Sequence, residues 1–150
     1  MSSRLFQSIR EERGLAYSVF STATSFKDDG LFFIYAGVGL GKEKEACAAI
    51  AEEMSRLARG GASPDELLKA KEQFKAHYIF GLESVSSRMF ATCRNMLTLD
   101  REVTPEEVMK GVDDVTPEKI KELAEAFADT SGYSTAVISG DEIEAGSLLP

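Results

Sequence analysis

The sequence predicts an α+β fold in which helices pack on one face of an antiparallel or mixed β-sheet. Two observations support this class: strand-like runs of β-branched and aromatic residues lie towards the two ends of the chain, and helical periodicity fills the long stretch between them. Such a segregated order is typical of α+β layers. With 43% hydrophobic and 28% charged residues, the 150 residues can form an ordinary globular core without disulfide or metal staples.

The chain opens with a predicted helix that leads into a β-hairpin. Residues 2–13 carry apolar side chains on one helical face, and Gly14 follows where a helix would end. Residues 15–26 and 31–36 are strand-like, and the Lys-Asp-Asp-Gly segment between them has turn chemistry. The second run is apolar on both faces, which indicates a strand inside the sheet.

Helical spacing then dominates the chain. One helix is expected over residues 42–59, with Gly60 and Gly61 at its end. Three later helices begin with a hydroxyl residue, a proline and nearby acidic residues, and these starts lie at Ser63, Thr104 and Thr116. The first two also carry the glutamate that completes a capping box, whereas the third does not.

The long helical pattern after Ser63 is expected to bend or break near Gly81 and the serines at 84–87. Residues 133–139 have the composition of a final strand before a polar tail. Three strands are few for so many helices. We therefore expect part of the sheet to be missing or to be contributed by another chain.

Charge and cysteine content exclude several classes of protein. Asp and Glu number 25 against 17 Lys and Arg, and the net charge of -8 would repel nucleic acid and anionic membrane surfaces. No apolar run approaches the length of a membrane helix, and the first residues lack the apolar core of a signal peptide. Cys47 and Cys93 stand alone, which favours a reducing compartment. We expect a soluble, cytoplasmic chain with neither nucleic acid nor membrane as a partner.

Two further motifs invite functional interpretations that their context does not support. The glycine-rich residues 37–42 lack the phosphate-loop spacing, because Ala36 stands where a glycine is needed and Glu43 where Ser or Thr is needed. His77 is the single histidine and lies in a helical pattern, whereas a zinc site usually needs several nitrogen or sulfur ligands. We interpret the first as a flexible strand-to-helix connection and the second as an ordinary helix residue.

The joint between the opening helix and the first strand carries the most informative pair. Arg10 lies near the end of the helix and Tyr17 early in the strand, with Gly14 between them. Such a joint can hold a guanidinium and a phenol on the same side, as two donors for a carbonyl or a developing oxyanion. The residues alone leave an alternative, in which Arg10 neutralises the helix C-terminus and Tyr17 is a half-buried strand residue.

Much of the chain resembles one known family. Its opening, Met-Ser-Ser-Arg-Leu-Phe-Gln followed by Ile-Arg-Glu-Glu-Arg-Gly-Leu-Ala-Tyr-Ser-Val from Ile9, is similar to a signature in the C-terminal domain of pitrilysin and insulinase metallopeptidases, which are related to mitochondrial processing peptidase. The likeness is nearest to their bacterial processing-protease branch, and it continues through residues 25–32, 83–89 and 104–107 and to a closing strand near Gly140. It implies a C-terminal, non-zinc peptidase domain over residues 1–140 and a polar tail over residues 141–150.

The resemblance also implies a function. Such enzymes are zinc-dependent endopeptidases built from two related α+β halves that close around a peptide. The zinc belongs to the N-terminal half, in a His-x-x-Glu-His helix with a later glutamate ligand. This chain has one histidine, so we expect it to hold no metal and no other cofactor, and to be inactive alone. Arg10 and Tyr17 match the family's arginine and tyrosine, which stabilise the tetrahedral intermediate, and are therefore its candidate catalytic residues.

The expected partners follow from the same resemblance. They are a peptide substrate and an N-terminal peptidase half or partner subunit. The first strand and helix of the family's domain would precede Met1 and are absent here, which predicts an exposed sheet edge and self-association, for example as a homodimer. Two alternatives stay open: a non-catalytic subunit that lends Arg10 and Tyr17 to a separate zinc-bearing subunit, or a structural relative like the processing-peptidase-like core subunits of respiratory complexes.

Overall fold

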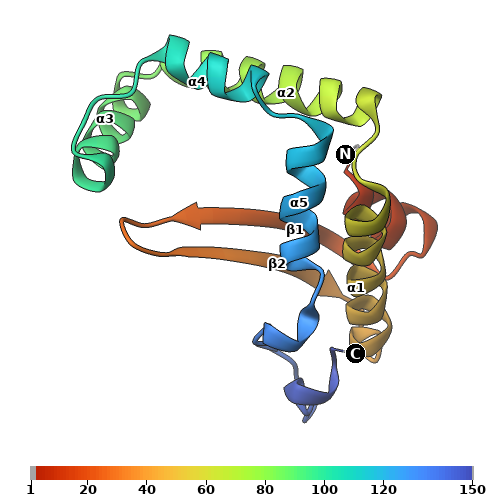
Figure 1. The fold of residues 1–150 in the computed structure, drawn as a ribbon. Helices are drawn as coiled ribbons and strands as arrows, with labels where there is room; N and C mark the ends of the chain where they lie inside the picture. Colours follow the sequence, from red (N-terminus) through yellow and green to blue (C-terminus); the bar gives the residue numbers. More distant parts are fainter. Residues whose placement is uncertain (1–2, 150) are drawn as a thin grey trace. The chain divides into compact units, whose positions relative to one another are not determined.

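The structure is a computed structural model that describes residues 3–149, and it confirms the α+β class (Figure 1). By its internal contacts the chain divides into two compact units. The first comprises Met1–Ala23, Leu31–Gly61 and Lys121–Pro150, and the second comprises Thr24–Gly30 and Ala62–Ile120.

The first unit opens with a π-helix, η1 (Phe6–Glu12), in place of the α-helix that the sequence predicts over residues 2–13. The backbone N–H of Arg13 donates to the carbonyl of Ser8 at 3.2 Å, five residues earlier, and this spacing defines the wider π turn. Gly14 follows with φ 59, a left-handed conformation that glycine adopts without steric cost, and it directs the chain into the first strand. The helix prediction is therefore right in place and wrong in type, and its start at Ser2 lies outside the described residues.

The predicted hairpin is confirmed as β1 (Ala16–Ser25) and β2 (Gly30–Val38), which pair in a two-stranded sheet within residues 3–149. Its turn is closed by the N–H of Phe26, which donates to the Asp29 carbonyl at 2.8 Å. One face of the hairpin is exposed and aromatic, because the Phe20 ring lies 5.2 Å from that of Tyr35 and 6.4 Å from that of Phe33. The opposite face of the hairpin contributes to the core.

Helix α1 (Glu43–Gly60) packs beside η1 and closes this core. The buried cluster consists of Ile9, Leu15, Ala16, Val19, Ala46 and Ala49. Alanines on the buried side of α1 let the helix approach closely, and Ile9 from η1 is completely buried. Phe127, from the end of a later helix, adds a ring 4.8 Å from Phe32 of β2. Helices therefore cover the core face of the hairpin, as predicted.

In the second unit the helices begin where the sequence predicts. They are α2 (Pro64–Leu82), α3 (Val85–Leu99) and α4 (Pro105–Asp113), and α5 (Pro117–Phe127) starts here and continues in the first unit. Both predicted capping boxes form: the Ser63 hydroxyl accepts from the Glu66 N–H at 3.2 Å, and the Thr104 hydroxyl accepts from the Glu107 N–H at 3.3 Å. The expected break separates α2 from α3 next to Ser84.

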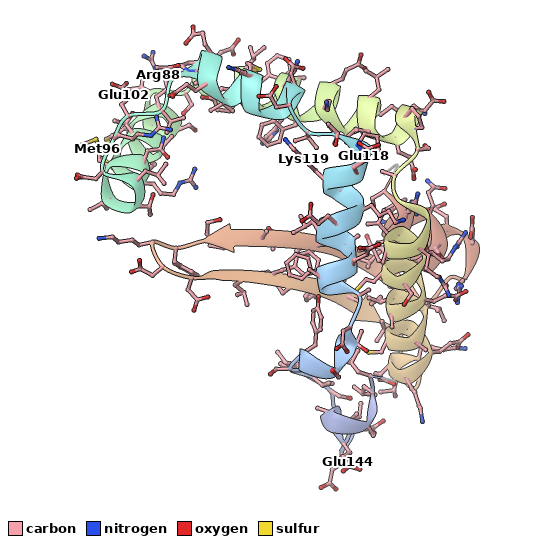
Figure 2. All side chains as sticks on the ribbon, viewed as in Figure 1. Arg88, Met96, Glu102, Glu118, Lys119 and Glu144 are labelled. Carbon is pink, nitrogen blue, oxygen red and sulfur yellow. The ribbon has the colours of Figure 1, made fainter. Side chains whose placement is uncertain are left out.

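The first turn of α5 carries Glu118 and Lys119, both labelled in Figure 2. The Lys119 ammonium group donates to the Asp114 carbonyl at 2.9 Å and so closes the loop between α4 and α5. Hydrogen bonds from its own backbone N–H and from the Thr116 hydroxyl lower the pKa of Glu118, as expected for a carboxylate at a helix N-terminus. At this third predicted helix start, the Glu118 carboxylate therefore interacts with the helix N-terminus although no capping box is present.

The predicted strand over residues 133–139 is wrong: this segment forms no strand in the structure. Its side chains alternate between partly buried and exposed, and Ile138 is fully exposed. A strand needs a neighbour for its backbone N–H and C=O groups, and among the described residues only β1 and β2 form a ladder, with each other. No helix in residues 3–149 is long and apolar enough to cross a membrane.

Candidate functional site

Arg10 is held at the surface by the burial of its neighbours in η1. Ser8 and Ile9 are buried, and Ile9 packs in the core with Leu15. These contacts fix the backbone at Arg10, whose side chain is 37% exposed. The buried isoleucine thus anchors the turn, and the adjacent arginine is directed towards the surface.

Tyr17 lies at the second position of β1, directly after the buried Ala16. Strand alternation places Tyr17 on the same face as the buried Val19, so alternation alone does not account for the exposure of Tyr17. Tyr17 is 83% exposed, and solvent reaches most of its side chain. The alternative in which Tyr17 is a half-buried strand residue is therefore wrong.

The structure brings Arg10 and Tyr17 together. The Arg10 guanidinium carbon lies 5.1 Å from the centre of the Tyr17 ring and 4.8 Å from the centre of the Phe6 ring. Both distances fall within the range of cation–π attraction. The Arg10 Nε atom also lies 3.7 Å from a carboxylate oxygen of Glu11, in a loose surface ion pair. One guanidinium is therefore shared by two aromatic rings, and a phenol hydroxyl is carried on one of them.

Arg13, three residues after Arg10, has a different role. Its guanidinium donates to a carboxylate oxygen of Glu52 on α1 at 2.6 Å. This hydrogen bond raises the pKa of Arg13 and lowers the pKa of Glu52. The pair ties the end of η1 to α1. Arg13 is thus engaged in the packing of the domain, while Arg10 lies against the rings.

Phe6 is the residue at this site that the sequence analysis assigned only to an apolar helical face. Its side chain is half-buried and contacts the Arg10 guanidinium. Residues four apart on a helix are neighbours, so the Phe6–Arg10 spacing was a signal that could have identified the contact. The apolar periodicity does not reveal this contact, because it assigns the Phe6 ring to the buried face of the helix.

The described residues offer no metal site. Between residues 3 and 149 no three His, Cys, Asp or Glu side chains lie close enough together to hold a metal ion. His77 lies on α2, Cys47 is half-buried on α1, and Cys93 is exposed on α3. The chemistry that this part of the chain can provide is hydrogen-bond donation and positive charge from Arg10 and Tyr17.

The fold and this site define the class of protein: an α+β domain that presents an arginine–tyrosine pair. In comparison with known families, residues 1–74 match the peptidase M16 inactive domain. Residues 1–74 are thus similar to the C-terminal, inactive domain of peptidase M16 proteins, and the relatives of the chain are of the bacterial type. The resemblance drawn from the sequence is confirmed.

Two bacterial relatives cover most of the chain. It is 38% identical over 139 residues to the uncharacterized zinc protease YmxG of Bacillus subtilis, which covers 93% of this chain and 34% of that protein. It is 33% identical over 124 residues to an uncharacterized zinc protease of Streptomyces coelicolor, which covers 83% of this chain and 27% of that protein. The chain thus spans about a third of the length of these relatives.

Two solved structures share the fold. A chain of complex III2 from Candida albicans, in a structure with Inz-5 bound, matches with a TM-score of 0.74 and 21% identity over 84% of this chain and 30% of its own. A conserved protein from Enterococcus faecalis matches with a TM-score of 0.69 and 24% identity over 82% of this chain and 28% of its own. At this identity the likeness concerns the fold.

Proposed function

We propose that this chain forms one half of the peptide-binding chamber of a zinc-dependent endopeptidase and supplies Arg10 and Tyr17 to the substrate carbonyl. The observation that carries the proposal is the joint placement of an exposed phenol and a guanidinium 5.1 Å from its ring. The match of residues 1–74 to the peptidase M16 inactive domain and the relatives named zinc proteases support it.

Zinc does not fit the residues described here, because none of them form a cluster of three metal ligands. The metal of the complete enzyme would be bound by the other half of the peptidase. The residues of this chain would act on the substrate without contact to the metal. The chain alone is then inactive and needs the N-terminal half or a zinc-bearing partner subunit.

The residues of this chain bind and orient the scissile carbonyl. The Arg10 guanidinium brings a fixed positive charge, and the Tyr17 hydroxyl brings a single hydrogen-bond donor. When the carbonyl oxygen becomes an oxyanion in the transition state, both donors interact with it more strongly than with the ground-state oxygen. The pair therefore lowers the barrier more than it strengthens peptide binding.

Tyr17→Phe tests this role in the complete peptidase, because it removes the hydroxyl and keeps the ring beside Arg10. We expect kcat to fall by about 10²-fold, the usual loss for one oxyanion donor, with KM changed much less. Tyr35→Phe is the matched control, since Tyr35 is also a strand tyrosine that solvent reaches, but it is half-exposed and stacks on Phe20. An unchanged kcat in Tyr17→Phe would remove this residue from the mechanism.

The description of the matched domain as inactive also suits a separate, non-catalytic subunit that lends the pair to a zinc-bearing one. The two arrangements differ in where the zinc motif is encoded. Zinc content and peptide hydrolysis are measured for the isolated chain and for the chain purified together with a zinc-bearing half. These measurements distinguish both arrangements from an enzyme that is active alone. Stoichiometric zinc and peptide hydrolysis by the chain alone would overturn both.

A further inference from the structure

We propose that Phe6 is a positioning residue that holds the Arg10 guanidinium beside Tyr17. This inference rests on the proposed function, because it assigns Phe6 a role through Arg10. The geometry that points to it is the Phe6 ring, which lies 4.8 Å from the guanidinium carbon, slightly nearer than the Tyr17 ring at 5.1 Å.

A second ring is needed because Tyr17 by itself is a poor anchor. It is 83% exposed, and an arginine side chain loses much rotamer freedom when it is fixed in one place. Phe6 is half-buried and belongs to the same helix as Arg10, about one turn away, and this helix is anchored by the fully buried Ile9. The more firmly held ring can therefore restrict the guanidinium before substrate arrives, which reduces the entropy lost on binding.

Aromatic rings also suit the chemistry better than a carboxylate would. A ring attracts the guanidinium over its face and leaves the N–H donors in the plane of the group available for a carbonyl oxygen. A paired carboxylate engages one or more of those donors, as Glu52 does for one N–H of Arg13 at 2.6 Å. Glu11 competes only weakly for Arg10, because its oxygen lies 3.7 Å from Nε and its side chain is 54% exposed. Phe6 and Tyr17 together keep Arg10 in the state that can act on substrate.

The test measures peptide hydrolysis by the complete peptidase with Phe6→Leu and Phe6→Tyr. We expect Phe6→Leu to lower kcat by roughly threefold to tenfold with little change in KM, and Phe6→Tyr, which keeps an aromatic face, to retain the wild-type rate. Phe6→Met supplies a flexible apolar side chain without a ring and is expected to behave like Phe6→Leu. Phe90→Leu makes the same chemical change at an exposed position of α3 and should have no effect.

A double-mutant cycle with Arg10→Ala separates positioning from packing. If Phe6 acts through Arg10, Phe6→Leu costs nothing further once Arg10→Ala is present. An equal loss of kcat from Phe6→Leu in both backgrounds would overturn the inference, as would full activity of Phe6→Leu or Phe6→Met. Normal turnover by Arg10→Ala and Tyr17→Phe would instead refute the proposed function itself, so the two failures are distinguishable.

Discussion

Truncation of Ile9 is the sharpest test of how the domain holds its functional turn. Ile9 is the one large side chain that is completely buried among the described residues, and it precedes Arg10 in η1. Its neighbours in the core include Leu15 of the following turn and Ala46 and Ala49 of α1. Ile9→Val removes one methylene group from this site, and Ile9→Ala removes most of the side chain.

The structure sets the size of the expected effect. Burial of one methylene contributes about 0.8 kcal/mol, so Ile9→Val should lower the free energy of unfolding by about 1 kcal/mol. Ile9→Ala leaves a cavity that the short side chains of Ala46 and Ala49 cannot fill, which places its cost in the upper part of the usual range, about 3–5 kcal/mol. Such a loss is a large fraction of the stability of a domain, which is usually about 5–15 kcal/mol.

Urea unfolding followed by far-UV circular dichroism measures these differences, and the chain has no tryptophan that could serve instead. Ile79→Val and Ile79→Ala are matched controls, because Ile79 on α2 is 53% exposed. Changes at Ile79 should stay within about 0.5 kcal/mol. A cost below about 1 kcal/mol for Ile9→Ala, or an equal cost at both positions, would refute the assignment of Ile9 as the anchor of this core.

Two other predictions concern ionisation and reactivity. Arg13 lowers the pKa of Glu52, so their pair stabilises the fold above the unfolded-state pKa of Glu52, and this contribution is lost as pH falls through the lower folded-state value. Glu52→Gln should therefore make Tm fall less steeply as the pH is lowered. Parallel curves of Tm against pH for the two proteins would contradict this. Burial raises the pKa of the half-buried Cys47 thiol, so a thiol reagent at neutral pH should modify the exposed Cys93 first. Cys93→Ser should remove the fast phase of the labelling reaction. A fast phase that survives in Cys93→Ser would count against this order.

Local chemistry made the helix starts and the hairpin predictable. A cap such as Ser63 or Thr104 satisfies backbone N–H groups within three residues of itself, so the sequence contains both partners of each hydrogen bond. The turn between β1 and β2 is closed in the same way, from Phe26 to Asp29. In each case no distant part of the chain is needed to decide the conformation.

Two features depend on more than local pattern, and there the sequence predictions failed. Residues 133–139 have a strand-like composition, but composition does not supply the neighbouring strand whose backbone would pair with them. The opening helix has an apolar face that suits an α-helix, yet its hydrogen bonds widen to the π form, with Arg13 bonded back to Ser8. The N–H of Leu15 reaches still further back, to the Ile9 carbonyl at 2.9 Å.

The two arginines of the opening helix show what geometry adds to sequence. Arg10 and Arg13 carry the same charge, and they lie in the last turn of η1 and at its C-cap, so an interaction with the helix C-terminus is available to both. The structure separates them by their neighbours, since Arg13 meets a carboxylate and Arg10 meets aromatic rings. A carboxylate engages hydrogen-bond donors of a guanidinium and neutralises its charge, whereas a ring over its face leaves the donors available. This difference supports the proposal that Arg10, and not Arg13, acts on a substrate carbonyl, with Phe6 and Tyr17 beside it.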